Sequence, residues 1–104
     1  MKELIDSFMS SKLRNAWLQT DSVNMYVRKG VHIIDGQLTN TFDLASITIA
    51  ENKRGCGLFK EIILYIESLG LPVYVESILN PKLADMLERH GYSLDADRFN
   101  AWKV

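Results

Sequence analysis

One stretch, residues 47–69, limits the possible folds of this chain more than any other. It begins with Ile47 and Ile49 alternating with more weakly apolar neighbours, which is the period of a β-strand. Its second half has apolar residues at helical spacing: Phe59, Ile62, Ile63, Ile66 and Leu69. The stretch therefore predicts a strand that leads directly into an amphipathic helix.

A basic turn with two glycines joins this strand to this helix. Arg54 precedes Gly55 and Gly57, and a helix that opens after such a turn presents free backbone N–H groups at its positive end. A P-loop is excluded because no Gly-Lys-Ser/Thr follows, and a dinucleotide fingerprint would require a glycine at Lys60. We expect a phosphate-binding turn; the alternative is a plain strand-to-helix connection.

Composition narrows the class of protein. The length predicts a single domain over residues 1–104, and a hydrophobic fraction of 47% is typical of a folded chain. A net charge of -1 indicates neither a general nucleic-acid binder nor a polybasic membrane anchor. The single cysteine, Cys56, excludes an internal disulfide, and the distance in sequence between His32 and His90 gives a metal site little support. With no apolar run long enough for a bilayer, we expect a cytoplasmic protein without a membrane partner.

The N-terminal third predicts helix and then a hairpin. Residues 1–18 have apolar stripes that indicate one helix, or two short ones separated at Ser10-Ser11. The segments Val23–Arg28 and Val31–Ile34 alternate like strands, and we expect the Lys29-Gly30 pair to join them as a tight turn. Asp35-Gly36 is a second strong turn signal.

The third strand, from about Thr41 to Ala50, changes its side-chain parity near Leu44-Ala45. Such a change predicts a β-bulge, which bends and splays a strand. The apolar run Pro72–Val75 then predicts a short strand buried on both faces. Because strand, helix and strand form a right-handed crossover, Ile47–Ala50 and Val73–Val75 should be parallel neighbours.

The last third predicts a capped helix and a final hairpin. Asn80 is a good N-cap, Pro81 suits the first helical position, and Gly91 ends the helix. The apolar stripe of this helix is Leu83, Met86, Leu87 and His90. Tyr92–Leu94 and Arg98–Lys103 then form a hairpin. The fold class is thus mixed α and β: a mostly antiparallel sheet with a central parallel strand pair and helices on its faces.

This order of elements, with this turn, resembles the GCN5-related N-acetyltransferase (GNAT) superfamily. The family's signature has two apolar strand residues followed by Arg/Gln-x-x-Gly-x-Gly/Ala; here Arg54 and Gly57 match, whereas Phe59 stands where a small residue is usual. A second block begins with Asn80 and ends in Gly91-Tyr92, as in the family. The resemblance covers roughly residues 22 to 103.

The resemblance implies an acyl-CoA cofactor, acetyl-CoA or a relative, and an amine-bearing acceptor. The turn amides, from Arg54 through Gly55, Cys56 and Gly57 to Leu58, would bind the pyrophosphate. The pantetheine would pair with the backbone near Ile47 and Ile49, in a wedge between the two parallel strands.

Two polar residues after the buried strand are candidates for chemistry. Glu76 would be the general base, because burial at a strand end raises the pKa of a carboxyl group; the alternative is a solvated strand end. Asn80 could contact the cofactor or relay a proton, or simply cap the helix. Asp43 and Glu51 are weaker acidic candidates.

Leu87 is the clearest departure from the family, because this position often carries a tyrosine that protonates the leaving thiolate. Tyr26, Tyr74 or Tyr92 could supply a phenol instead. The leading hypothesis is an acetyl-CoA-dependent N-acyltransferase. Its alternatives are a catalytically reduced member that serves as an interaction or structural module and a non-catalytic acyl-CoA binder, with a homodimer or a protein partner possible.

Overall fold

The computed structural model describes all residues from 1 to 104 and contains three α-helices, a 3-10 turn and six strands. The elements follow the chain in this order: α1 (Lys2–Ser10), β1 (Asn15–Gln19), β2 (Val23–Ile34), β3 (Gln37–Ile49), η1 (Glu51–Lys53), α2 (Leu58–Ser68), β4 (Val73–Val75), α3 (Pro81–Arg89), β5 (Ser93–Leu94) and β6 (Ala101–Lys103). From β3 onward the helices and strands follow the order that the sequence predicts, whereas the elements before β3 differ from the prediction.

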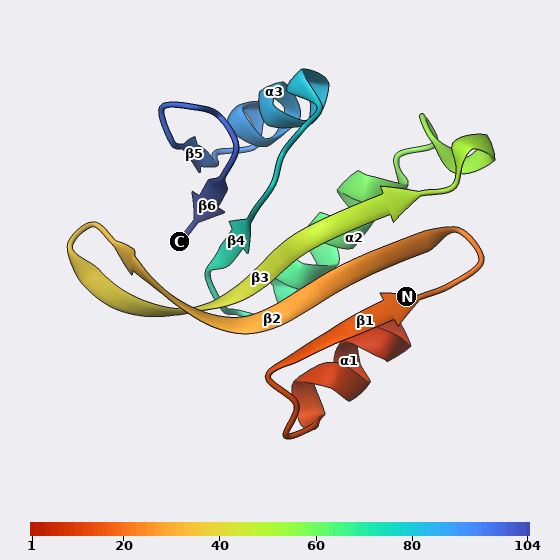
Figure 1. Ribbon diagram of the computed structural model, residues 1–104, viewed down its shortest axis with the longest axis horizontal. Coiled ribbons are helices and arrows are strands. Elements are labelled where there is room, and N and C mark those ends of the chain that lie inside the picture. Colours follow the sequence, from red (N-terminus) through yellow and green to blue (C-terminus); the bar gives the residue numbers. More distant parts are fainter.

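The strands form one mixed sheet in the order β1-β2-β3-β4-β6-β5. Only β3 and β4 run parallel; every other neighbouring pair is antiparallel. Figure 1 shows β2 and β3 as a long hairpin whose closed end extends past the other strands. The GNAT-like sheet expected from the sequence, with its single parallel pair at the centre, is confirmed.

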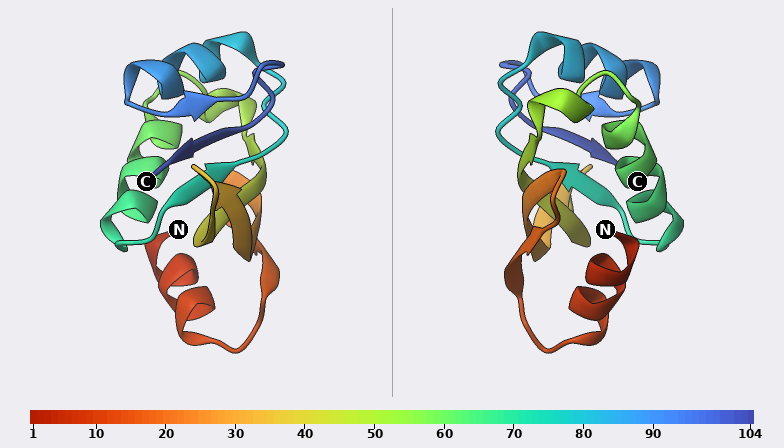
Figure 2. Two further views of the ribbon diagram at one scale, coloured as in Figure 1. Left: turned by 90° about the vertical axis from the view of Figure 1, so that its left-hand side faces the viewer. Right: turned by 90° about the vertical axis from the view of Figure 1, so that its right-hand side faces the viewer.

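One hydrophobic cluster joins this sheet to all three helices. Alternation along β2 directs Val23, Met25 and Val27 into it, and helical spacing directs Ile62 and Ile66 of α2 toward them. In Figure 2, α1 and α2 lie on one side of the sheet and α3 lies across its end. The opposite parity of the same strands leaves polar and aromatic side chains on the sheet face away from the helices.

The prediction of a hairpin turn at Lys29-Gly30 is wrong. Strand β2 continues through these residues to Ile34, and the chain reverses at Asp35-Gly36, where both residues have positive φ (52° and 80°). Two left-handed residues are what a two-residue hairpin turn of type I′ requires. Gly30 has another role: a Cβ there would lie 2.0 Å from Oδ2 of Asp43.

The prediction of helical structure throughout residues 1–18 is also wrong. Only residues 2–10 are helical, and Asn15–Gln19 form strand β1, which pairs with β2. Leu18 is buried with 7% of its surface exposed, whereas its neighbour Trp17 is 61% exposed. The side chains of this segment therefore alternate between the two faces, as they do in a strand. With so few apolar residues in the segment, spacings of three and four positions do not distinguish a helix from a strand.

The predicted bulge is confirmed. Tyr26 pairs with Ser46 but Val27 pairs with Leu44, so Ala45 is the extra residue in β3. The parallel neighbours differ from the expected ones, however: β4 pairs with Phe42–Leu44 and not with Ile47–Ala50. The contact ends at the bulge because the bulge turns the rest of β3 away from β4.

Candidate functional site

A wedge-shaped opening begins where β3 and β4 separate. The last backbone bond between them runs from Glu76 N to Leu44 O at 2.9 Å. Beyond it β3 continues with no neighbour on this side, while the chain after β4 turns away at Ser77, whose φ is +57°. The cavity between them has a volume of about 280 Å³, and Ile47 and Asn80 lie on its opposite walls. We call this cavity the wedge.

The turn before α2 is open and unbonded. Gly55 and Gly57 have φ of +79° and +76°, conformations that glycine adopts without strain, and nothing lies within 4 Å of where their Cβ atoms would be. No hydrogen bond in the loops or caps has its donor among the amides of residues 55–60. These amides at a helix N-terminus can therefore bind an anion.

The side chains around this turn complete a basic rim. Lys53, Arg54 and Lys60 are exposed and form no ion pair; Arg54 Nε donates to Ile49 O at 3.0 Å, which ties the turn to the end of β3. Cys56 and Leu58 line a second cavity of about 370 Å³ directly beside the turn. A ligand that enters from this side has donors, positive charge and room.

Asn80 caps α3 as the sequence predicts. Its Oδ1 accepts a hydrogen bond from Lys82 N at 2.9 Å, and Pro81 occupies the first helical position. Its Nδ2 has no partner within the chain, and the residue lines the wedge. The cap and the cofactor contact are therefore compatible, because they use different atoms of the same amide.

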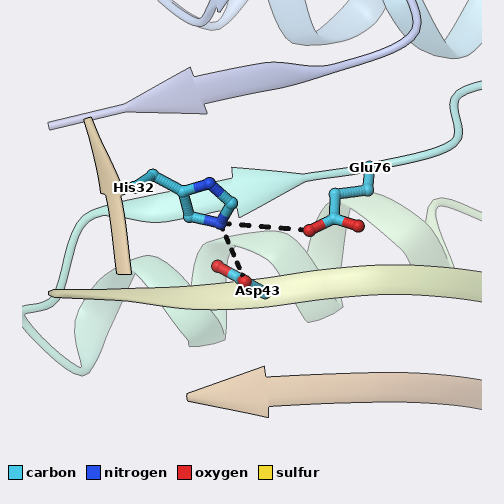
Figure 3. Close-up of side chains that lie close together, drawn as sticks. All are labelled: His32, Asp43 and Glu76. Carbon is cyan, nitrogen blue, oxygen red and sulfur yellow. Dashed lines mark hydrogen bonds and ion pairs between the residues drawn. The ribbon is translucent and has the colours of Figure 1, made fainter. Parts of the chain in front are cut away.

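A second group of polar side chains lies on the face of the sheet opposite the helices, at the narrow end of the wedge. It comprises Arg28, His32, Asp43 and Glu76, which we call the strand cluster. Arg28 donates to both carboxylate oxygens of Glu76, at 3.1 and 3.3 Å. His32 Nε2 lies 2.9 Å from Asp43 Oδ2 and 3.9 Å from Glu76 Oε1 (Figure 3).

Asp43 is the fixed centre of the strand cluster. It is completely buried, its Oδ1 accepts a hydrogen bond from Thr41, and the missing Cβ of Gly30 leaves room for its carboxylate. A buried carboxylate is stable only when it is paired and hydrogen-bonded. Thr41, His32 and the Arg28 guanidinium, 3.8 Å away, supply these partners.

The ligand atoms of His32, Asp43 and Glu76 lie within 4.8 Å of one another, a separation that a metal ion could bridge. Arg28 already places a positive charge 3.1 Å from Glu76 Oε1 and 3.8 Å from Asp43 Oδ2. The guanidinium thus supplies the positive charge that a metal ion would supply, and we assign no metal to the strand cluster.

Aromatic rings extend the strand cluster along the same face. Tyr74 stacks on His32 with ring centroids 3.7 Å apart and planes 4° apart, and Trp102 stacks on the far side of Tyr74 at 5.9 Å. Burial, with the nearby carboxylates of Asp95, Glu76 and Asp43, raises the pKa of Tyr74 above its ordinary value. These stacks hold the imidazole in one plane.

Comparisons with known proteins agree with this architecture. No family model and no curated protein matches the chain. Among solved structures it matches "The crystal structure of KacTA-DNA complex" with a TM-score of 0.60 and 14% identity, over 98% of this chain and 74% of that chain. The match is to KacT, an acetyltransferase of the GNAT family. This chain has a GNAT-like fold. An identity of 14% supports the fold alone.

Within the GNAT-like fold, the structure brings some of the sequence candidates together and leaves others apart. The turn from Arg54 to Leu58 lies at the N-terminus of α2, and the wedge contains Ile47, Glu76 and Asn80. Ile49 lies outside the wedge and pairs with Val23. None of the helices has the length and apolarity needed to cross a membrane.

The two departures from the family's signature have structural explanations. Leu87, which the resemblance places at the position of the usual tyrosine, is fully buried in the core with Ala84, and Phe59 packs half-buried against the same core. Tyr92 is buried too, and its hydroxyl donates to Glu67 Oε2 at 2.9 Å. Of the phenols considered from the sequence, Tyr74 is in direct contact with the strand cluster.

The sequence did not reveal the strand cluster as a unit. In the sequence, Asp43 and Glu76 are separate acidic candidates, and His32 enters only as a candidate metal ligand. Arg28 and His32 share one face of β2, but the predicted turn at Lys29-Gly30 would have placed them on different strands. The alternation of Arg28, Gly30 and His32 in one continuous strand was the signal that could have found it.

Proposed function

We propose that this protein is an acetyl-CoA-dependent N-acyltransferase that moves an acetyl group to an amine by direct transfer. The observation that carries the proposal is the wedge between the parallel strands, with the unbonded amides of residues 55–60 at the N-terminus of the helix between them. The GNAT-like fold supports an acyl-CoA, which would supply an activated acyl thioester.

The residues present fit that cofactor. Anionic phosphates would meet the amides from Gly55 to Leu58 and the guanidinium of Arg54, whose terminal nitrogens form no ion pair. An extended amide-bearing arm would lie in the wedge against the unpaired edge of β3 at Ile47, with Asn80 Nδ2 as a donor from the other wall.

The reacting end would then reach the narrow end of the wedge, where Glu76 ends the contact between β3 and β4. The sequence predicts Glu76 as the general base; in this arrangement its carboxylate would attract the acceptor as an ammonium ion before that ion loses its proton. Holding the two reactants at this point would contribute most of the rate enhancement by proximity.

Calorimetric titration with acetyl-CoA tests this proposal. We expect saturable binding by the unchanged protein and a loss of about 100-fold in Gly57→Glu, equivalent to about 2.7 kcal/mol. The control is Gly36→Glu, which has the same open surroundings and a similar φ of +80° but lies in the hairpin turn. Absence of binding by the unchanged protein at millimolar acetyl-CoA would contradict the proposal.

The burial of Leu87 favours a second candidate, a GNAT-like module that binds acyl-CoA or a protein without chemistry. No phenol at that position is available to protonate a leaving thiolate, although water can do so. Release of CoA in the presence of amines separates the two candidates: turnover supports the transferase, and binding without turnover supports the module.

A further inference from the structure

We infer that His32, held by Asp43, accepts the proton of the attacking amine; this inference rests on the proposed function. The imidazole and the buried carboxylate come from adjacent strands, β2 and β3, and meet at 2.9 Å on the face of the sheet opposite the helices. They lie beside the residue pair Leu44 and Glu76, where the wedge closes.

The hydrogen bonds determine which ring nitrogen is free. Asp43 Oδ2 accepts, so Nε2 carries the proton and the lone pair of a neutral imidazole is on Nδ1. Nδ1 has no partner in the chain, and Asn24 Oδ1 is the only buried side-chain polar atom without one, so Nδ1 reaches solvent. The arrangement is an imidazole oriented by a buried carboxylate with its second nitrogen available.

Neighbouring groups fix the ring in this orientation. Thr41 donates to the other oxygen of Asp43, and Tyr74 stacks flat against the imidazole. Asp43 and Thr41 are therefore positioning residues. A base that is already oriented requires no rearrangement at the moment of proton transfer.

Glu76 is less suited to take the proton. Its two oxygens both accept hydrogen bonds from Arg28, at 3.1 and 3.3 Å, and this fork stabilises the charged carboxylate. His32 has no such competing partner on Nδ1. Glu76 lines the wedge and lies next to the imidazole, with its Oε1 3.9 Å from His32 Nε2.

A separate cavity of about 290 Å³ gives the acceptor access to this point. It is lined by Arg14, Asn15, Arg28, His32 and Asp43, among others, and lies at the open edge of β2 beyond the end of β1. In the step, a bond forms between the amine nitrogen and the acyl carbon as the carbon–sulfur bond breaks. The amine proton goes to His32 Nδ1, and the departing thiolate takes a proton from water.

Chemical rescue tests this assignment. The probe is release of CoA from acetyl-CoA with ethylamine, spermidine and L-lysine amide, measured for the unchanged protein and for His32→Ala with and without imidazole. We expect His32→Ala to lower the rate about 100-fold, within the range for loss of a general base. Added imidazole should raise the rate of His32→Ala at least about tenfold, which would not happen if His32 had only a structural role.

His90→Ala is the matched control. His90 is the other histidine, its Nδ1 is bonded to Met86 O in the last turn of α3, and it lies outside the strand cluster. Thermal unfolding and calorimetric binding of acetyl-CoA are measured for each variant, so that loss of folding or of cofactor binding is seen directly. His90→Ala should keep the rate of the unchanged protein.

Each result has one meaning. Retained rate in His32→Ala, or a loss that imidazole does not restore, would overturn the inference. Bound acetyl-CoA with no release of CoA by any of the three amines would also overturn it and leave the cofactor site standing. Failure of the unchanged protein to bind acetyl-CoA would overturn the proposed function itself.

Discussion

The wedge and the strand cluster lie at the same point of the sheet but are built in different ways. The wedge and its turn come from one continuous strand–turn–helix segment together with the start of α3. The strand cluster takes one or two residues from each of β2, β3 and the end of β4, and it exists only when the strands are in register. The wedge and its turn are mostly local structure, whereas the strand cluster depends on how the strands pair.

This difference determines what each region tolerates. The turn is exposed and has few internal contacts, so its residues can be changed with little effect on stability. Asp43 is completely buried, and a change that leaves it unpaired disturbs the whole fold. Function in the wedge should therefore be separable from folding, whereas a change at Asp43 should affect folding and the strand cluster together.

The largest expected effect comes from Gly30→Ala. Its Cβ would lie 2.0 Å from Asp43 Oδ2 and would displace the carboxylate from His32. We expect the free energy of unfolding to fall by about 1–3 kcal/mol, the cost of leaving a buried polar group unpaired. Urea unfolding measures the loss, and the affinity for acetyl-CoA in the folded protein should be unchanged.

Gly36→Ala is the comparison variant: its methyl group enters open space, so any loss of stability comes from the left-handed φ of +80° and not from a clash with a neighbour. If Gly30→Ala were as stable as the unchanged protein, the packing of Asp43 against Gly30 would not matter. If it abolished acetyl-CoA binding while the protein stayed folded, the two regions would not be separable.

A smaller effect is expected from Tyr92→Phe, which tests whether a buried phenol takes part in either region. The hydroxyl bonds to Glu67 on α2, away from the wedge, so the loss should be about 1 kcal/mol of stability with no change in CoA release. Urea unfolding and CoA release are measured in parallel. A drop in CoA release larger than the loss of folded protein would assign Tyr92 a role in transfer.

The same residue gives a pH dependence of stability. Burial, followed by the hydrogen bond and the charge of Glu67, raises the pKa of Tyr92 in the folded protein. The unfolded chain releases this proton from about pH 10, so the stabilisation is complete below that pH and is lost as the pH rises above it. Tyr92→Phe should therefore lose less stability than the unchanged protein between about pH 10 and 11.5.

An effect of about the same size is expected at Asn80, where the wedge and a helix cap meet. Asn80→Ala removes the cap and should cost about 1 kcal/mol of unfolding free energy, whereas Asn80→Asp keeps an acceptor for Lys82 N. If Nδ2 contacts the cofactor, both variants should bind acetyl-CoA more weakly. Equal affinity in Asn80→Asp and the unchanged protein would make Asn80 a cap and nothing more.

The sequence predicted well where the signal is local. The glycine turn, the N-cap at Asn80 and the bulge at Ala45 each depend on a few adjacent residues, and the structure confirms all three conformations. What these residues bind stays a prediction, because a conformation does not identify a ligand.

The sequence failed where the answer depends on pairing. Gly30 was interpreted as a turn residue, whereas it lies in mid-strand to admit the carboxylate of Asp43. With the turn at Asp35-Gly36, counting back along both strands places Arg28 opposite Asp43. A single misplaced turn therefore hid the strand cluster, because its residues are distant in sequence and meet only through strand register.

The most direct test of the central claim is to map acetyl-CoA onto the backbone by NMR. The account predicts that amide signals of residues 55–60 and of Ile47 shift on titration, while those of the hairpin tip, residues 33–38, do not. Shifts confined to other parts of the surface, or none at millimolar ligand, would contradict the claim that the wedge and its turn form an acyl-CoA site.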